Sequence, residues 1–139
     1  MKHAGRIQYL LDTNICIYLI QTKSSKVITR FKECDINEIG ISTITMAEME
    51  FGICGCIRID EAMQGFLNFV TPLEIVDFTS ADAHEYGKIR HHLKQIGKPI
   101  GGNDLLIAAQ AISRDIILVT NNEKEFSRVP GIKIENWSK

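Results

Sequence analysis

Long apolar runs are missing from this sequence of 139 residues. No stretch approaches the ~20 apolar residues that a membrane-spanning helix needs. The apolar stretch behind the basic start ends at Asp12, which is too short for a signal peptide. These absences predict a cytoplasmic protein that does not enter a membrane. In that compartment the four cysteines are expected to be reduced thiols that serve packing, namely Cys16, Cys34, Cys54 and Cys56.

The motifs of several enzyme classes are missing as well. There is no CxxC pair and no histidine at zinc-finger spacing, which argues against a zinc module. Neither GxxxxGK followed by Ser or Thr nor GxGxxG occurs, so a nucleotide-dependent enzyme is not supported. A serine or cysteine hydrolase needs a nucleophile elbow and a suitably placed histidine, and the chain has neither.

Charge is low overall but unevenly distributed. The length predicts one domain, 1–139. The net charge of this domain is −1. However, segments 22–32 and 86–103 each hold four cations and no acid, so together they carry +8 and the remaining residues carry −9. Segregated charge can hold a phosphate backbone in one place. We expect Arg90, Lys94 and Lys98 to make such contacts, and solvated helix faces are the alternative.

Short apolar runs alternate with helical patterns along the whole chain. The patterns predict buried strands at 7–11, 39–42, 73–78, 116–119 and 132–134. They predict helices at 12–20, 24–34, 43–53, 60–69, 79–95 and 103–112, the fifth opened by a capping box of Thr79 and Asp82. This alternation predicts an α/β fold with a parallel sheet covered on both faces. The functional site of such a fold lies beyond the carboxyl ends of its strands.

Two acidic residues follow the first two predicted strands. Asp12 comes directly after the first strand, where a helix N-cap is the alternative interpretation. Glu48 lies one turn after Ile44 and one turn before Phe51, so we expect it on the apolar face of its helix. A capping box with Thr45 is the alternative there. Glu50 is rotated ~200° from Glu48 and should be solvated.

Two further polar residues follow later elements. Asp104 comes after the glycine-rich loop 97–102 and opens a fully apolar helix, where the helix dipole alone also favours an acid. Asn122 follows the fourth strand, and by itself it is a turn residue.

Asp12, Glu48 and Asp104 should converge at one edge of the sheet without an adjacent cationic partner. Such carboxylates repel unless they are protonated or bind a cation, and oxygen ligands select Mg²⁺ or Mn²⁺. Carboxylate-held Mg²⁺ is suited to phosphodiester cleavage.

These residues also belong to segments that carry a family resemblance. The segments are Leu10-Leu11-Asp12-Thr13-Asn14, Ile41-Ser42 through Glu48 to Gly52, Pro99 through Asn103-Asp104 to Ala109, Val119-Thr120-Asn121-Asn122 with Phe126, and Val129-Pro130-Gly131 with Trp137. In this order they resemble the motifs of PIN-domain ribonucleases, most of all the VapC toxins of bacterial type II toxin–antitoxin systems. The resemblance implies a three-layer α/β/α sandwich with a mainly parallel sheet of about five strands, and an endoribonuclease that needs Mg²⁺ or Mn²⁺. It also implies a structured RNA substrate such as a transfer RNA, a homodimer, and a VapB-like antitoxin that covers the site.

The resemblance assigns roles to the polar residues. It places Asp12, Glu48 and Asp104 at the acidic, metal-binding positions, and Thr13 or Asn14 and Thr120 at positions that support the metals or their waters. Asn122 falls where many members carry a fourth acid, so the site is one charge short there. An Asn oxygen or a bridging water could still serve a second metal.

Two rival interpretations belong to other functional classes. The first is a PIN fold that has lost catalysis and only binds RNA or protein, and Asn122 is its supporting feature. The second is a phosphoacceptor receiver domain, with Asp77 near the end of the third strand as the acceptor. A receiver needs an acidic pair after the first strand and a lysine beyond the fifth. This sequence offers one acid there, and Lys133 lies within the strand.

Overall fold

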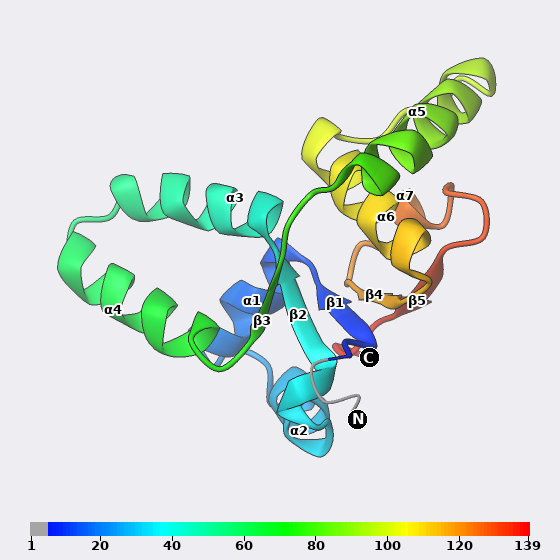
Figure 1. Ribbon diagram of the computed structural model, residues 1–139. Helices are drawn as coiled ribbons and strands as arrows, with labels where there is room; N and C mark the ends of the chain where they lie inside the picture. The colour runs from blue at the N-terminus through cyan, green and yellow to red at the C-terminus, as the bar shows by residue number, and fades with distance from the viewer. Residues whose placement is uncertain (1–5) are drawn as a thin grey trace.

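The computed structural model describes residues 6–139, and a five-stranded sheet lies at its centre (Figure 1). All pairings are parallel, in the order β3-β2-β1-β4-β5. The strands are β1 Tyr9–Leu11, β2 Ile39–Ser42, β3 Glu74–Val76, β4 Ile117–Val119 and β5 Lys133–Glu135. The parallel sheet is therefore confirmed, although β1 and β3 are shorter than the apolar runs that predicted them.

Helices cover both faces of this sheet. They are α1 Thr13–Ile20, α2 Ser25–Glu33, α3 Thr43–Cys54, α4 Ile59–Val70, α5 Ser80–Gln95, α6 Gly102–Arg114 and α7 Glu123–Phe126. Successive strand residues point to opposite faces. Leu10 accordingly packs in a core with α5 and α6, while Leu11 packs in a second core with α1, α2, α3 and α4. Two cores around one sheet make the three-layer α/β/α sandwich that was expected.

Side-chain caps explain where most helices begin. Asp12, Ser24 and Ser42 each accept a backbone N–H at the start of the helix that follows. Thr79 and Asp82 form the predicted capping box of α5. Helix α6 starts at Gly102, inside the segment that was expected to be a loop. The 3-10 turn Ile36–Glu38 and α7 were not predicted, because elements of three or four residues are too short to show a periodic pattern.

The exposed side of α3 corrects two expectations. Thr45, Met49 and Ile53 face the core, whereas Phe51 is 82% exposed, so the apolar face was assigned wrongly. The α3–α4 hairpin extends away from the sheet (Figure 1). All four cysteines are free, and Cys16 is buried as expected. Cys54 and Cys56, however, are exposed at the hairpin turn and do not serve packing.

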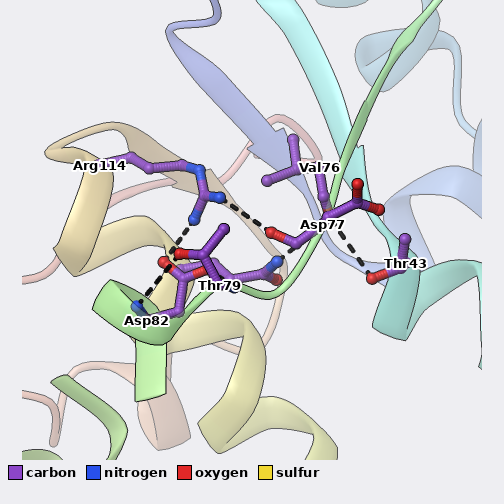
Figure 2. A network of polar contacts seen from close by, with 7 residues as sticks. Thr43, Val76, Asp77, Thr79, Asp82 and Arg114 are labelled. Carbon is purple, nitrogen blue, oxygen red and sulfur yellow. Dashed lines mark hydrogen bonds and ion pairs between the residues drawn. The ribbon is translucent and has the colours of Figure 1, made fainter. Parts of the chain in front are cut away.

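A polar network ties the end of β3 to α5 and α6 (Figure 2). Asp82 is fully buried and pairs with Arg114 at the end of α6. The other guanidinium nitrogen of Arg114 donates to the Asp77 carbonyl at 2.9 Å. The Thr43 hydroxyl donates to the Val76 carbonyl at 3.5 Å, which joins α3 to the same strand end. The network fixes α5 and α6 relative to the sheet, and both helices border the site described below.

Among residues 6–139, no helix combines the length and the apolar character that crossing a membrane requires.

Candidate active site

The register of the parallel strands brings Asp12 beside Thr120. Leu11 is paired with Val119, and each strand ends at that residue, so both side chains project from the carboxyl edge of the sheet. The Thr120 hydroxyl donates to Asp12 Oδ2 at 2.5 Å, and the Ile15 N–H donates to Asp12 Oδ1 at 3.0 Å. Asp12 is therefore both the N-cap of α1 and a member of the acidic cluster. The two interpretations of this residue were not exclusive.

Glu48 connects three helices at the same edge. The Thr13 hydroxyl at the start of α1 donates to Glu48 Oε1 at 2.5 Å. The Asn103 amide at the start of α6 donates to Glu48 Oε2 at 3.3 Å. Helix α3 begins at Thr43 with Ser42 as its cap, so Thr45 is no N-cap and the capping box with Glu48 does not form. Glu50 is exposed, as predicted.

Asp104 completes the predicted trio and has a neighbour that the sequence did not reveal. Burial raises the pKa of Asp104 to about 7, together with a hydrogen bond to the Glu125 carboxyl and the charges of Glu125, Glu48 and Asp12. Burial likewise raises the pKa of Asp12, and the charge of Glu48 adds to this. Carboxyls perturb one another in this way only when they share a site. The structure thus brings Asp12, Glu48 and Asp104 together with Glu125.

Glu125 lies on α7, three residues beyond Asn122. Its Oε1 accepts the Gly101 N–H at 3.2 Å, which holds the carboxylate against the start of α6. The only signal in the sequence was an acid one helical turn after Asn122, and that signal is visible only if the short helix is known. Glu125 therefore supplies a fourth acid close to the position where Asn122 lacks one.

The remaining predicted residues do not join this cluster directly. The Asn122 N–H donates to the Thr120 hydroxyl at 3.0 Å, so its backbone supports the residue that holds Asp12. Asn14 is exposed on the first turn of α1. Arg90, Lys94 and Lys98 are exposed on α5 and the loop that follows it. Arg90 and Lys94 line a groove that reaches Gly102, next to the acids.

The donor set can be compared with the needs of a divalent cation. Within residues 6–139, no group of three or more His, Cys, Asp or Glu side chains is already arranged to hold a metal ion. The residues nevertheless fit a hard cation, because every donor is an oxygen. Burial and the charges of the neighbouring carboxyls together raise the pKa of Asp104, and a bound cation would offset both effects. The ligands would be Asp12, Glu48, Asp104 and Glu125, with Thr13 and Thr120 orienting two of them.

The receiver interpretation finds no support in this geometry. Lys133, its candidate lysine, forms an ion pair with Asp115 at 2.8 Å. Asp77 lies in the network at the end of β3, where its carbonyl is bound by Arg114 (Figure 2).

Comparisons with known proteins point to one family. The family model of the PIN domain matches residues 9–132. Ribonuclease VapC2 of Rickettsia felis is 40% identical over 132 residues, which are 94% of this chain and 98% of that protein. The tRNA(fMet)-specific endonuclease VapC of Salmonella typhimurium is 36% identical, over 94% and 98% of the two chains. A crystal structure of DNA-bound VapBC from Salmonella typhimurium matches with a TM-score of 0.89 and 36% identity, over 94% of this chain and 98% of that one.

Proposed function

The chain belongs to the PIN-domain family and, within it, to the VapC ribonucleases, and from that premise we propose that it is the endoribonuclease toxin of a toxin–antitoxin pair. The observation that carries the proposal is the cluster of Asp12, Glu48, Asp104 and Glu125 at the carboxyl edge of the sheet. In the part of the chain that the structure describes, none of these carboxylates forms an ion pair with a basic side chain. Their charge is available for a metal ion and its RNA substrate.

Catalysis by this family needs a divalent metal, and we assign Mg²⁺ or Mn²⁺ as the ion. When bound, the ion activates a water and stabilises charge on the attacked phosphate. The chain's own residues hold and orient it. Thr120 fixes one oxygen of Asp12, and Thr13 and Asn103 fix the two oxygens of Glu48. Asp104, whose pKa is raised to about 7, holds a proton near neutral pH that it would give up on binding a cation.

Glu125 takes the role that we first expected near Asn122. Its carboxylate contacts Asp104, whereas Asn122 supports Thr120 through its backbone. With Glu125 included, the cluster holds four acids and is not short of charge. The absence of an acid at Asn122 therefore does not weaken the site.

The substrate and partners follow from the family. The substrate is RNA, and a relative is named as specific for tRNA(fMet), so a transfer RNA is the first candidate here. The protein partner is a VapB-like antitoxin that covers the site, as expected for a member of VapBC complexes. The toxin itself is proposed to be a homodimer of single-domain chains, 1–139.

The test is cleavage of transfer RNA by the purified chain, freed of antitoxin, in Mg²⁺ or Mn²⁺ against EDTA. Glu48→Gln should lower the rate at least ~100-fold, the scale for losing one electrostatic contact to a transition state. Glu50→Gln is the matched control, because it removes the same charge from the exposed side of the same helix. Cleavage that persists in EDTA, or equal rates for both variants, would refute the proposal.

A binding module without catalysis is the second candidate, and it applies if Glu125 does not replace the acid that is missing at Asn122. Glu125→Gln and Asn122→Asp separate the two candidates. If Glu125 is the fourth acid, Glu125→Gln abolishes cleavage and Asn122→Asp leaves it within a few-fold of the unmodified chain. If the chain only binds RNA, the unmodified protein does not cut, and Asn122→Asp is the variant that restores activity.

A further inference from the structure

We propose that the groove between α5 and the segment leading into α6 binds a nucleobase of the RNA strand, next to the nucleotide that is cut. The groove has a volume of about 660 Å³, within the range of small-molecule sites. Leu93 and Leu105 form its buried floor, and Arg90 and Lys94 stand at its rim. This inference rests on the proposed function, because it assigns a specificity site to the same nuclease.

The rim carries a prearranged aromatic and cationic pair. Arg90 donates to the Tyr86 hydroxyl at 2.8 Å, and its guanidinium carbon lies 5.9 Å from the centre of the Tyr86 ring. The two residues are one helical turn apart, so α5 holds both planar groups at the mouth of the groove. Aromatic rings and arginine planes are the surfaces on which proteins stack unpaired RNA bases. An apolar floor below a stacking pair is suited to a flat base rather than to phosphate alone.

The Gly101–Gly102 peptide connects the groove to the acidic cluster. Gly102 lines the groove, and Gly101 is the residue just before it in the chain. A Cβ placed on Gly101 would lie 3.6 Å from Asp104 Oδ2 and 3.9 Å from Glu125 Oε1. Helix α7 and the residues after it hold the loop between the two sites, since Arg128 donates to the Pro99 carbonyl at 3.0 Å and Glu125 accepts the Gly101 N–H. A strand with its phosphate at the acids therefore places a neighbouring nucleotide at the groove.

The positive charge at the rim of the groove favours RNA as its occupant. Segment 86–103 contains four cations and no acid, so the rim attracts a polyanion. A second groove, between α1, α3 and α4, has the opposite character: its lining is mainly apolar, with Glu48 and Glu61 as its charged residues. Figure 1 shows α3 and α4 on one side of the sheet and α5 and α6 together on the other. Of the two, only the α5–α6 groove combines a base-sized apolar floor with positive charge.

The test compares Arg90→Gln with Lys88→Gln. Both variants remove one cation from α5, but Lys88 lies outside the groove and pairs with Glu85 at 3.7 Å. With an RNA stem–loop as substrate, Arg90→Gln and Tyr86→Leu should raise KM at least ~10-fold with kcat within about threefold, since one base stack is worth roughly 1–3 kcal/mol. Lys88→Gln should change KM less than about twofold. Equal effects of Arg90→Gln and Lys88→Gln would overturn the inference.

A direct readout uses stem–loops with 2-aminopurine at each loop position in turn, bound to the Asp12→Asn variant. Stacking in the groove should quench one position, and Tyr86→Leu should remove that quenching. Uniform fluorescence at every position would overturn the inference even if wild-type cleavage is normal, whereas failure of the proposed function would appear as an absence of cleavage. If Arg90→Gln instead weakens self-association in sedimentation, or antitoxin binding without any effect on RNA, the groove is a protein interface and the inference is wrong.

Discussion

One oxygen of Asp12 accepts the Ile15 N–H at the start of α1, and the other accepts the Thr120 hydroxyl. Substitutions can separate these tasks. Asn is as good an N-cap as Asp, so Asp12→Asn should keep the free energy of unfolding within ~0.5 kcal/mol and abolish cleavage. Asp12→Ala loses the cap as well and should cost about 1 kcal/mol. Urea denaturation and the cleavage assay check both; an Asn variant that still cuts would remove Asp12 from the metal site.

The raised pKa of Asp104 predicts an unusual pH dependence. The carboxyl has a pKa of about 7 in the folded chain and ~3.9 when unfolded, so the folded state holds its proton more tightly. Stability from this group is therefore fully present below the unfolded pKa and is lost as the pH rises toward and through 7. In EDTA, urea midpoints should fall between pH 5 and pH 8, and Asp104→Asn should flatten the fall.

Mg²⁺ provides the second half of that experiment. Because a bound cation takes the place of the proton, adding Mg²⁺ should raise the urea midpoint more at pH 8 than at pH 5. Asp115→Asn is the control, since it removes an exposed carboxylate that does not belong to the acidic cluster. Parallel pH profiles for the unmodified chain and Asp104→Asn would show that Asp104 does not carry the effect.

At the scale of single residues, sequence reasoning found the acids that follow predictable elements. Asp12 and Asp104 were proposed because one comes just after a strand and the other opens a long apolar helix. Glu48 was proposed from an apolar face that the structure does not confirm, although its carboxylate does lie at the same edge. Glu125 could not be placed, since its carboxylate reaches Asp104 only through the turn of the four-residue helix α7. Asn103 was missed for a related reason: its contact with Glu48 joins residues 55 positions apart.

Among the elements, the packing of α5 against α6 depends on the buried carboxylate of Asp82. Burial raises the pKa of this carboxyl, but Arg114 and the Thr79 N–H lower it, and the net pKa lies below the ordinary value. Removing one partner of a buried ion pair leaves the other uncompensated, so Asp82→Asn should cost about 2–4 kcal/mol of unfolding free energy at pH 7. Asp60→Asn, an exposed first-turn acid of α4, should cost less than about 0.5 kcal/mol.

The sign of the pH effect at Asp82 is opposite to that at Asp104. A lowered folded pKa contributes stability above the unfolded pKa and loses it as the pH falls through the folded value. The difference in urea midpoint between the unmodified chain and Asp82→Asn should therefore shrink toward pH 3. A constant difference from pH 7 to pH 3 would indicate that Asp82 acts through packing and not through its charge.

Element boundaries were predictable where a cap marks them. Ser42 and Thr79 begin α3 and α5 as the sequence indicated. The buried side of α3 was not predictable, because α3 packs on the sheet with one end and on α4 with the other. Hydrophobic spacing alone placed Phe51 and Ile53 on the buried side, whereas the tertiary packing buries Ile53 with Met49 and leaves Phe51 exposed.

Over the whole molecule, the two basic segments differ in their setting. Arg30 in segment 22–32 packs over the rings of Tyr9 and Trp137, with its guanidinium carbon 5.6 and 5.2 Å from the ring centres. It therefore holds α2 against β1 and the chain's end. Helix α2 lies at the end of the sheet away from the start of α3 (Figure 1), so its lysines are far from the acidic edge. Segment 86–103, by contrast, leads directly to Asp104.

This difference predicts how RNA binding responds to salt. Each phosphate contact to single-stranded RNA contributes ~0.7 to the slope of log Kd against log salt. Lys94→Gln should lower that slope by about one contact, whereas Lys26→Gln, which removes the same charge from α2, should leave it unchanged. Binding titrations of a stem–loop RNA from 50 to 300 mM KCl, in the Asp12→Asn background, measure both slopes. Equal reductions would mean that the RNA wraps around the sheet to α2 and that the positive charge of the whole molecule acts as one surface.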